Sequence, residues 1–352
     1  MSARRSVLAT LIVLLGSLLA ACGSDDSSSS SSPTSSPSTS DAGSEAPAES
    51  VFPVTVTHEF GETTVEDEPT RVVTVGVTEQ DVVLQLGVVP VGVTEWYGDQ
   101  PFATWPWAQE LLGDAEPEVL SVSDGFEFER IAALQPDLIV GTNAGITKKD
   151  YALLSQIAPT VASPAGANDF FAPWQDQTLL IAQSLGLEAE GQALIDDLDG
   201  RFAEIAAAHP EWADMTATFS QGGPYDGLLY VYPAGLATEF LTDLGFTMTE
   251  GLEGYAPEIG SQAEISAENV NLIDADLIVF ATESQEQFDD LQGFGTISSL
   301  GAVAEGRAAY TDETLAGAIY FLTPLSLDYV LDQLVPTLEL ATAGEAPREY
   351  PA

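Results

Sequence analysis

Runs of β-branched and apolar residues alternate with segments of helical spacing along most of the chain. In the first half, Arg71–Gly76 and Val88–Val93 have the composition of buried strands. The segment Thr78–Gly87 between them predicts a short helix, with its first residue as a candidate N-cap and its final glycine as the stop. A helix at Phe128–Leu134 then precedes a strand at Asp137–Val140. Such alternation predicts an α/β fold built on a parallel sheet.

The second half of the chain repeats this scheme. Leu228–Tyr232 predicts a strand, Ala237–Phe246 a helix that stops at its glycine, and Ser266–Phe280 a helix followed by a strand. In each half a glutamate, Glu129 or Glu268, lies eight residues before the sequence Asp-Leu-Ile-Val. The shared spacing favours two related lobes, and chance similarity between generic α/β segments is the alternative.

A long helical stretch connects the two halves. Apolar residues recur at helical spacing from Trp174 to Trp212, and only Gly186 and its neighbours interrupt the pattern. This connection predicts a stiff joint between the lobes and hence a small hinge motion. The last helix-like stretch, Ser326–Ala341, is expected to pack back onto the body.

The first residues have the layout of a secretory signal. Arg4 and Arg5 precede the apolar stretch Val7–Ala20, which is short for a membrane span. The stretch leads into Leu-Ala-Ala-Cys, which resembles the lipobox of bacterial lipoproteins and implies cleavage before Cys22 and acylation of its thiol. Because Cys22 is the only cysteine, an intramolecular disulfide and a multi-cysteine zinc site are excluded. A buried or incidental cysteine is the alternative.

A serine-rich segment follows Cys22. Its 28 residues, Gly23–Ser50, cannot bury a core and have a typical random-coil reach of roughly 30 Å. They are expected to hold a globular body off the lipid surface. The predicted divisions of the chain are a lipoprotein signal peptide (1–21), a Ser-rich disordered tether (22–53), an N-terminal lobe (54–168), connecting helices (169–209), a C-terminal lobe (210–322) and a C-terminal helix and tail (323–352).

The charge and the scarcity of histidine exclude several classes of function. A formal net charge of −46 argues against nucleic acid and anionic lipid surfaces as partners. His58 and His209 are the only histidines and are expected at the surface. The chain therefore lacks the converging ligands of a zinc or manganese site, and it offers few histidines for a Ser-His-Asp triad. The chain contains no GxSxG, HExxH or Walker A motif. These features argue against an enzyme, and a structural surface lipoprotein would not need a paired-lobe cleft.

Several phrases occur in a fixed order in the body of the chain. They are PTRVVTVG (69–76), LQLGVVPVGV (84–93), FERIAALQPDLIVG (128–141) and LLSQIAPTV (153–161). Together they closely resemble the substrate-binding proteins of iron-siderophore and vitamin B12 ABC importers. The phrase WPWAQ (105–109) is similar to the actinobacterial iron-siderophore lipoproteins among them.

The resemblance implies a class III periplasmic-binding-protein fold, with two Rossmann-like α/β lobes joined by a long helical backbone and the ligand cleft between them. It implies capture of a ferric siderophore, which itself holds the iron, and delivery to an ABC permease and its ATPase. No cofactor is expected. The protein is then a monomer, exported and lipid-anchored to the outer face of the cytoplasmic membrane. Independently, open α/β sheets bind ligands at the C-terminal ends of their strands.

An aromatic insertion distinguishes the first half. Gly87 and Glu129 are 42 residues apart, against 23 between Gly245 and Glu268, so the first half carries about 19 extra residues. They fall largely in Glu95–Glu110, directly after a strand end and so at the expected rim of the cleft.

Flat apolar side chains with polar handles suit a bulky chelate. The candidate ligand-binding residues are Trp96, Tyr97, Trp105 and Trp107 of the insertion, together with Asn143 and Tyr232 from other strand ends. An aromatic mini-core that stabilises the insertion is the alternative role for the tryptophans.

The cationic residues constrain the ligand. Siderophore proteins that hold strongly anionic ferric catecholates or citrates commonly use clustered arginines, and this body has few. Some hydroxamate-binding relatives place an arginine shortly before the Glu129 motif, where this chain has Ser121–Gly125. A ferric complex of low net charge, of hydroxamate or mixed type, is therefore predicted. Haem bound through a tyrosine such as Tyr225 or Tyr232, or a corrinoid, is the alternative.

In the resembled family, a glutamate at the top of each lobe forms salt bridges with arginines of the permease. The residues that match are Glu129 and Glu268. The alternative is an acidic residue favoured at a helix N-terminus by the helix macrodipole.

Overall fold

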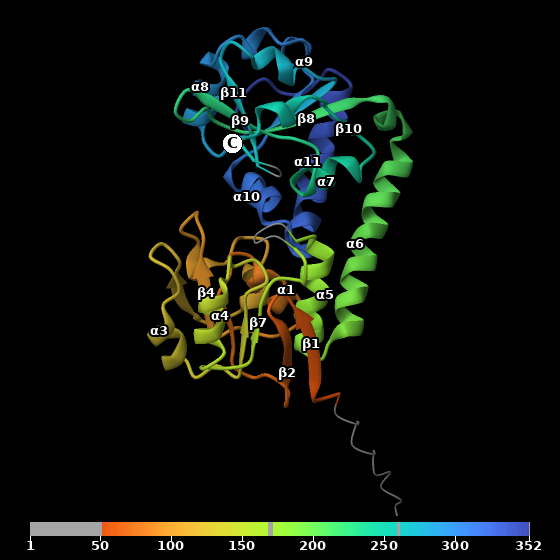
Figure 1. The fold of residues 1–352 in the computed structure, drawn as a ribbon. Coiled ribbons are helices and arrows are strands. Elements are labelled where there is room, and N and C mark those ends of the chain that lie inside the picture. The colour runs from red at the N-terminus through yellow and green to blue at the C-terminus, as the bar shows by residue number, and fades with distance from the viewer. Residues whose placement is uncertain (1–50, 168–171, 259–260, 352) are drawn as a thin grey trace, which may run out of the picture. The chain divides into compact units, whose positions relative to one another are not determined.

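Two large β-sheets flanked by helices, with a separate two-stranded sheet, form the part of the chain that the structure describes, residues 51–167, 172–258 and 261–351 of this computed structural model (Figure 1). Cys22 and nearly all of the predicted tether lie outside the described residues. The first sheet belongs to an N-terminal lobe and the second to a C-terminal lobe. Helix α6 (Glu188–Ala208) runs along one side from the first lobe to the second (Figure 1).

The N-terminal lobe is built on a parallel sheet in the order β5-β4-β3-β6-β7. Its strands are β3 (Val72–Thr74), β4 (Gly92–Glu95), β5 (Glu118–Ser121), β6 (Leu138–Val140) and β7 (Thr160–Val161). Its helices are α1 (Glu79–Gln85), η1 (Pro101–Ala103), α2 (Gln109–Leu112), α3 (Phe128–Ala133), α4 (Lys148–Leu154) and α5 (Trp174–Ser184). An antiparallel hairpin of β1 (Val54–His58) and β2 (Gly61–Val65), which the sequence did not predict, packs against α5.

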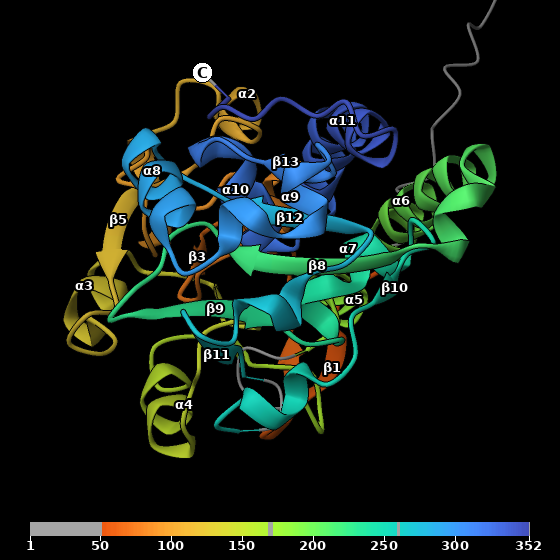
Figure 2. The ribbon, with the colours of Figure 1, turned by 90° about the horizontal axis from the view of Figure 1, so that it is seen from above.

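The C-terminal lobe is built on a mixed sheet in the order β11-β9-β8-β12-β13, with β10 also paired to β8. Its strands are β8 (Thr216–Gln221), β9 (Leu228–Tyr232), β10 (Thr247–Met248), β11 (Ala263–Ser266), β12 (Leu277–Ala281) and β13 (Ala308–Tyr310). Its α-helices are α7 (Glu239–Thr242), α8 (Gln285–Gly293), α9 (Gly301–Ala304), α10 (Glu313–Phe321) and α11 (Pro324–Thr342). Its 3-10 helices are η2 (Pro210–Asp214), η3 (Leu236–Thr238), η4 (Leu252–Tyr255), η5 (Val270–Ile273) and η6 (Ile297–Ser299). Seen from above, β8, β9 and β12 cross the lobe between α8 and α6 (Figure 2).

Strands β6 and β12 are apolar at every position because both of their faces are buried. Along β6, Leu138 and Val140 pack into one apolar cluster and Ile139 packs into another on the opposite face. Along β12, Val279 and Ile278 divide in the same way. Full burial of such a side chain stabilises the fold by about 1.5–3 kcal/mol. This two-sided burial explains why both Asp-Leu-Ile-Val sequences are continuous apolar runs rather than alternating ones.

The aspartate that opens each of these sequences makes the same contact in both lobes. Asp137 accepts hydrogen bonds from the backbone N–H and the hydroxyl of Thr70, at 2.8 and 2.9 Å. Asp276 accepts the same pair from Thr216, at 2.9 and 2.8 Å. Each threonine lies at the start of the neighbouring parallel strand, β3 or β8. The shared phrase therefore marks equivalent positions in two similar lobes.

Two predictions about strands are wrong in detail. The predicted strand Val88–Val93 begins only at Gly92, because Pro90 has no N–H to donate to a ladder and Val89 is exposed. The sheet of the second half is not parallel throughout, since β9 pairs antiparallel with both β8 and β11. The residues Leu228–Tyr232 do form a strand, but its apolar pattern carries no information about direction.

Two predicted helices of the second half are mostly absent. Within Ala237–Phe246 the α-helical part is α7, only four residues long, and after Gly245, at φ 107°, the chain enters β10. The helix predicted after Ser266 is the short 3-10 helix η5. Its buried residues Val270 and Ile273 are three positions apart, so a single 3-10 turn is enough to bury both.

The predicted helical connection is two helices that meet at Gly186, whose φ is 72°. Helix α5 packs on α1 and β1 of the N-terminal lobe, which leaves α6 as the helix that leads to the C-terminal lobe. The final predicted helix is confirmed as α11, which packs into the core of that lobe. Among the described residues, no helix combines the length and the apolar character needed to cross a bilayer.

Candidate functional site

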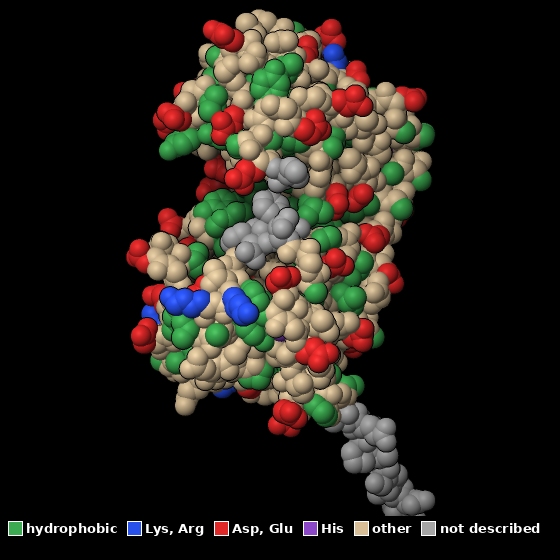
Figure 3. All heavy atoms as spheres, in the orientation of Figure 1, with side chains coloured by type: hydrophobic (Ala, Val, Ile, Leu, Met, Phe, Trp, Pro, Cys, Tyr) green, Lys and Arg blue, Asp and Glu red, His purple; other side chains and the backbone are tan. Residues whose placement is uncertain are grey.

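Loops at the C-terminal ends of the parallel strands border a hollow of about 300 Å³ in the N-terminal lobe. It is lined by Val75 and Val77 after β3, Val122, Gly125 and Phe126 after β5, Ala144 and Gly145 after β6, and Asp150 of α4. Open α/β sheets bind ligands at this edge, and pockets for small molecules begin at about this size. Figure 3 shows the surface hollowed between the two lobes, with hydrophobic side chains and Asp or Glu side chains along the hollowed part.

The side chains that line this hollow are apolar, with one exception. Its one charged residue, Asp150, is occupied as part of the capping box of α4, where its N–H donates to the Thr147 hydroxyl at 3.2 Å and its carboxylate accepts from the Thr147 backbone N–H at 3.3 Å. Gly125 and Gly145 have φ of 91° and 58°, conformations that let the loops turn sharply at the rim. The hollow therefore suits an apolar or weakly charged ligand.

The aromatic insertion between β4 and β5 forms one cluster with α10 of the C-terminal lobe. Trp105 and Trp107 stack with ring centroids 5.1 Å apart and 13° between their planes. Tyr97 lies 5.2 Å from Trp105, and Trp96 meets Tyr97 edge-on at 4.8 Å. Phe321 of α10 contacts Trp96 and Trp107 at 5.5 and 5.2 Å. The insertion thus joins the two lobes through aromatic contacts, which we call the aromatic wall (Trp96, Tyr97, Trp105, Trp107 and Phe321).

Trp105 is the buried centre of the aromatic wall, with 1% of its surface exposed. A β-carbon at Gly98 or at Gly317 of α10 would lie 2.6 Å from its ring, so glycine at both positions makes room for the indole. Its position fits the alternative of an aromatic mini-core. Trp96 is 43% exposed and presents an open ring, and its contact with a ligand stays a prediction.

Tyr97 faces the C-terminal lobe. Its ring centroid is 6.4 Å from that of Tyr320 on α10. Burial raises the pKa of Tyr97 above its ordinary value, and the carboxylate of Glu283, which follows β12, adds to the rise. The Tyr97 hydroxyl is buried and finds no hydrogen-bond partner among the described residues. A buried polar group of this kind can be satisfied by a ligand in the cleft.

Tyr232 lies at the C-terminal end of β9, as predicted from its position in the sequence. Its ring stacks on Phe219 with centroids 4.8 Å apart. Burial raises the pKa of Tyr232, whereas hydrogen bonds with the side chains of Gln221 and Gln262 lower it. Tyr232 therefore belongs to a neutral, hydrogen-bonded cluster at the strand ends of the C-terminal lobe, and its contact with a ligand stays a prediction.

Asn143 lies where the loops after β3 and β6 meet, and most of its polar groups are used within the protein. Its backbone N–H donates to Glu79 Oε1 at 2.6 Å, and its Nδ2 donates to the Thr78 hydroxyl at 3.0 Å. Its Oδ1 is buried without a partner among the described residues. The N-cap candidate Thr78 is confirmed as the N-cap residue of α1, although its side chain makes no capping bond and accepts from Asn143 instead.

Glu79 ties these loops together. Burial raises the pKa of its carboxyl, and backbone N–H groups, including those of Asn143 and Thr78, lower it. A β-carbon at Gly76 would lie 2.0 Å from the carboxylate, so glycine is needed where Glu79 folds over the chain.

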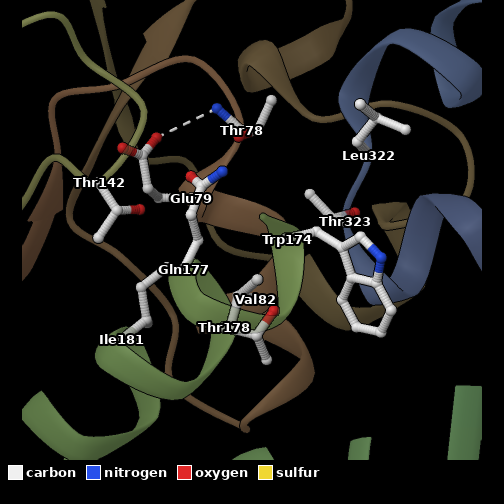
Figure 4. A pocket seen from close by; sticks show the side chains of 10 residues that line it. All are labelled: Thr78, Glu79, Val82, Thr142, Trp174, Gln177, Thr178, Ile181, Leu322 and Thr323. Carbon is white, nitrogen blue, oxygen red and sulfur yellow. Dashed lines mark hydrogen bonds between the residues drawn. The ribbon is translucent and has the colours of Figure 1, made fainter. Parts of the chain in front are cut away.

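A much smaller cavity of about 10 Å³ lies between α1, α5 and the start of α11 (Figure 4). In Figure 4, Leu322 and Thr323 approach from the α10–α11 side, facing Trp174 and the side chains of α1. The space is about enough for one water molecule. This cavity therefore marks the junction of the lobes and is too small for a chelate.

The arginines of the described residues are all engaged. Arg71 donates to the backbone carbonyls of Leu134 and Gln135, and Arg348 donates to that of Ala304. Arg130 forms ion pairs with Glu118 and Glu127, and Arg201 with Asp328 and Asp332. Arg307 forms an ion pair with Glu305. Arg71 and Arg307 precede β3 and β13, at the sheet edges opposite the strand C-termini. Lys148 and Lys149 open α4 and form no ion pair with another described residue.

Glu129 and Glu268 are both exposed, one in each lobe. Glu129 lies in the first turn of α3, and Glu268 lies in the loop between β11 and η5. Neither forms an ion pair within the described part of the chain. The helix-macrodipole alternative therefore applies to Glu129 only, and the docking role of both stays a prediction.

His58 is buried, which contradicts its predicted surface position. It is 2% exposed, and its Nε2 is 2.9 Å from the Thr63 hydroxyl in the β1–β2 hairpin. His209 packs against Trp212 beside Glu339. Within the described ranges, His, Cys, Asp and Glu form no group of three or more that could hold a metal ion.

A sequence model of the periplasmic binding protein family matches residues 72–315, a range that includes both sheets and the strand-end loops. The chain belongs to the periplasmic binding protein family. This membership confirms the family resemblance and the two-lobed α/β fold predicted from the sequence. It also places the protein among substrate-binding proteins of transport systems rather than among enzymes.

Solved structures of similar binding proteins cover most of the chain. A periplasmic solute-binding protein of Mycobacterium smegmatis is 41% identical with a TM-score of 0.76, over 82% of this chain and 98% of that one. PiaA of Streptococcus pneumoniae, solved in complex with ferrichrome, is 28% identical with a TM-score of 0.68, over 83% and 99%. SirA of Staphylococcus aureus, solved with staphyloferrin B, is 25% identical with a TM-score of 0.64, over 80% and 98%.

A curated relative also matches along most of its length. YhfQ of Bacillus subtilis, provisionally named as an ABC transporter substrate-binding lipoprotein, is 25% identical over 302 residues, which is 81% of this chain and 82% of YhfQ.

The apolar lining of the hollow was not predicted from the sequence of this binding protein. The strand-end candidates were aromatic or polar, whereas the hollow is lined mainly by aliphatic residues and glycines, with Phe126 and Asp150 beside them. The rule that ligands bind at strand C-termini already points to Val75–Val77, Val122–Phe126 and Ala144–Gly145, which directly follow β3, β5 and β6.

Proposed function

We propose that this binding protein is the substrate-binding component of an ABC importer. It captures a ferric siderophore of low net charge, of hydroxamate or mixed type, in the cleft between the lobes and delivers it to a membrane permease and its ATPase. The proposal is carried by the hollow of apolar side chains at the strand ends, by the aromatic wall between the lobes, and by the engagement of every arginine of the described residues within the protein.

The charge of the cleft argues for the class of chelate. Three hydroxamate groups neutralise a ferric ion, whereas catecholate complexes carry a large negative charge. Lys148 and Lys149 are exposed at the start of α4, and no arginine of the described residues is free to accompany an anion into the cleft. Burial of an anion without such a partner costs several kcal/mol. The carboxylate of Glu283 close to Tyr97 adds repulsion, on the order of 4 kcal/mol for like charges 4 Å apart near a protein surface. A neutral complex avoids both the cost of burying a charge and the repulsion by Glu283.

The relatives support a ferric chelate and leave its class to this chain's own residues. PiaA was solved with ferrichrome, a trihydroxamate, and SirA with staphyloferrin B. Ferrichrome and staphyloferrin B are thus both bound by proteins of similar fold. Because the arginines of the described residues are engaged within the protein, a chelate of the ferrichrome kind is favoured here.

Tryptophan fluorescence tests the proposal, because the aromatic wall contains Trp96, Trp105 and Trp107. The full-length protein is titrated with ferrichrome, ferric citrate, haemin and cyanocobalamin. We expect saturable quenching by ferrichrome and at least 100-fold weaker binding of ferric citrate. Saturable binding of haemin or cobalamin alone would support the alternative ligand, and quenching by none of the four would reject the proposal.

Two variants sharpen the titration. Trp96→Ala removes the exposed ring of the aromatic wall and should weaken ferrichrome binding by about tenfold, or ~1.4 kcal/mol. Leu340→Ala is the control, since Leu340 is 42% exposed near the C-terminal end of α11 and should leave affinity unchanged.

Glu129 and Glu268 are proposed to dock to the permease. The double variant Glu129→Ala/Glu268→Ala should lose most iron-chelate uptake in cells while the purified protein keeps its affinity. Glu204→Ala, another exposed glutamate on α6, is the matched control and should transport normally. Unchanged uptake by the double variant would exclude the docking role.

A lipid on Cys22 is proposed to hold the protein at the outer face of the cytoplasmic membrane, as the lipoprotein name of YhfQ supports. Mass spectrometry of the mature N-terminal peptide should find an acylated Cys22. The variant Cys22→Ala should release the protein from the membrane fraction, and continued membrane attachment of that variant would contradict the proposal.

A further inference from the structure

Asp81 of α1 is a buried carboxylate at the place where three elements meet. None of its surface is exposed. One oxygen, Oδ2, accepts hydrogen bonds from the indole Nε1–H of Trp107 at 2.8 Å and from the hydroxyl of Thr323 at 2.8 Å. Trp107 belongs to the aromatic wall, and Thr323 is the N-cap of α11. A single atom therefore connects a helix of the N-terminal lobe with the wall and with a helix of the C-terminal lobe.

This arrangement is unfavourable as packing alone. Burial raises the pKa of Asp81 to about 7, although the hydrogen bonds from Trp107 and Thr323 lower it. Its second oxygen, Oδ1, has no partner among the described residues. An apolar side chain of similar size would fill the position without the desolvation of a carboxylate. The carboxylate instead orients two hydrogen-bond donors on other elements, because both must point toward its Oδ2.

The first donor controls the aromatic wall. The Trp107 ring stacks on Trp105 and meets the edge of Phe321, and it also lies 5.9 Å from Tyr329 of α11. A rotation of Trp107 would therefore disturb the ring that lies between Gly98 and Gly317. The orientation of one indole N–H thus sets the packing of the wall.

The second donor lies at the elbow between α10 and α11. Leu322 has φ 50°, a left-handed conformation that ends α10 and reverses the chain. Thr323 follows, and its hydroxyl oxygen also accepts from the backbone N–H of Ser326 at 3.0 Å as the N-cap of α11. Figure 4 shows Leu322 and Thr323 on the side opposite Thr142 and Ile181, with Trp174 next to Thr323. The bond to Asp81 holds this elbow against α1.

We propose that Asp81 is a positioning residue for ligand binding. Through Trp107 and Thr323 it holds the aromatic wall against the α10–α11 elbow, and it thereby sets the affinity for the ferric chelate without touching it. The effect on affinity rests on the proposed function, whereas the effect on the orientation of the wall does not.

Two substitutions separate the orienting effect of the Asp81 hydrogen bonds from the effect of filling the space that its side chain occupies. Asp81→Asn keeps an acceptor oxygen for both donors, whereas Asp81→Leu keeps the number and branching of side-chain heavy atoms and removes the acceptor. Two indoles stacked at 5.1 Å couple strongly in circular dichroism, so the ligand-free protein reports the geometry of the wall directly. We expect Asp81→Leu to lose the coupled tryptophan signal and to bind ferrichrome at least tenfold more weakly. Asp81→Asn should keep the signal and stay within about threefold of the wild-type affinity.

Two further variants protect the test against simple misfolding. Trp107→Phe keeps a ring at the position and removes only the N–H donor, and combining it with Asp81→Leu should add little to either single change. Asp137→Asn is the control, since this aspartate also accepts from another segment, yet it lies at the opposite edge of the sheet. It should lower stability without a change in the tryptophan signal or in affinity.

Two results would overturn the proposal. One is an unchanged tryptophan signal in Asp81→Leu, which would show that the carboxylate does not orient the wall. The other is an equal loss of ferrichrome affinity in Asp137→Asn, which would show a general loss of structure. If the wild type does not bind ferrichrome, the proposed function fails, while the circular dichroism still decides whether Asp81 positions Trp107.

Discussion

The two lobes share a frame and differ in what is attached to it. Each contains a parallel strand pair tied by the same aspartate and threonine contact, Asp137 with Thr70 and Asp276 with Thr216. The N-terminal lobe adds the aromatic insertion and a β-hairpin, whereas the C-terminal lobe adds the antiparallel strands β9 and β11. The candidate ligand contacts from the insertion and Tyr232 lie on these additions. We therefore expect the frame to supply most of the stability, and the additions to join the strand-end hollow of the frame in ligand recognition.

Removal of one large buried side chain from each lobe should break this comparison most clearly. Trp105 is 1% exposed in the aromatic wall, and Trp212 is fully buried between His209 and Phe246 at the base of the C-terminal lobe. Each Trp→Ala change should lower the free energy of unfolding by about 3–5 kcal/mol. Only Trp105→Ala should also weaken ferrichrome binding, by about tenfold or more, because Tyr97 and Trp107 lose the ring on which they pack.

Urea unfolding and fluorescence titration measure the two effects separately. Trp105→Phe keeps an aromatic ring in the same space and should recover most of both losses. Equal weakening of ligand binding by Trp105→Ala and Trp212→Ala would mean that the aromatic wall has no specific role in recognition.

The frame itself is tested by its matched aspartates. Asp137→Ala removes acceptors for Thr70 and for the backbone N–H of Arg71, and Asp276→Ala removes the acceptor for Thr216. At about 1 kcal/mol for each hydrogen bond lost, each change should cost about 2–3 kcal/mol, with Asp137 at the higher end. Ligand affinity should not change in either variant. If only one of the two variants lost stability, the two contacts would share their geometry but not their contribution to the free energy of unfolding.

The frame was predictable from the sequence because its signals are local. Continuous apolar runs identified the buried strand at Leu138–Val140 and its counterpart at Leu277–Ala281, and the long amphipathic stretch identified α11 nearly to its ends. The direction of β9 was not predictable, since Leu228–Tyr232 has the same composition in either orientation.

The site was less predictable because its decisive contacts join distant parts of the chain. Asp81 and Thr323 are 242 residues apart and no local pattern relates them. The insertion was recognised by its length and its tryptophans, but the burial of Trp105 depends on Gly317 in α10. His58 was expected at the surface because its partners, Thr63 and Tyr151, come from β2 and α4, elements that cover it only in the folded lobe.

His58 provides the smallest expected effect, and it is specific to the hairpin of the N-terminal lobe. The backbone N–H of Phe60 donates to His58 Nδ1 at 3.2 Å, and the Thr63 hydroxyl donates to the carbonyl of Thr160 at 2.7 Å. These bonds assign the neutral ring with its proton on Nε2, which donates to Thr63. Burial also lowers the pKa of His58 below its ordinary value.

The consequence is a dependence of stability on pH with a defined sign. The unfolded chain takes up a proton on this imidazole below about pH 6.5, whereas the folded hairpin resists it, so stability falls as the pH drops below that value and is constant for this group above it. The free energy of unfolding of the wild type and of His58→Gln, measured from pH 7.5 to 5.5, should converge as the pH falls. Tyr151→Phe removes a neighbouring hydroxyl and keeps the imidazole, so it should retain the wild-type slope. A constant difference between wild type and His58→Gln across this range would mean that the imidazole protonates as readily in the folded hairpin as in the unfolded chain, and that the hairpin does not depend on the neutral ring.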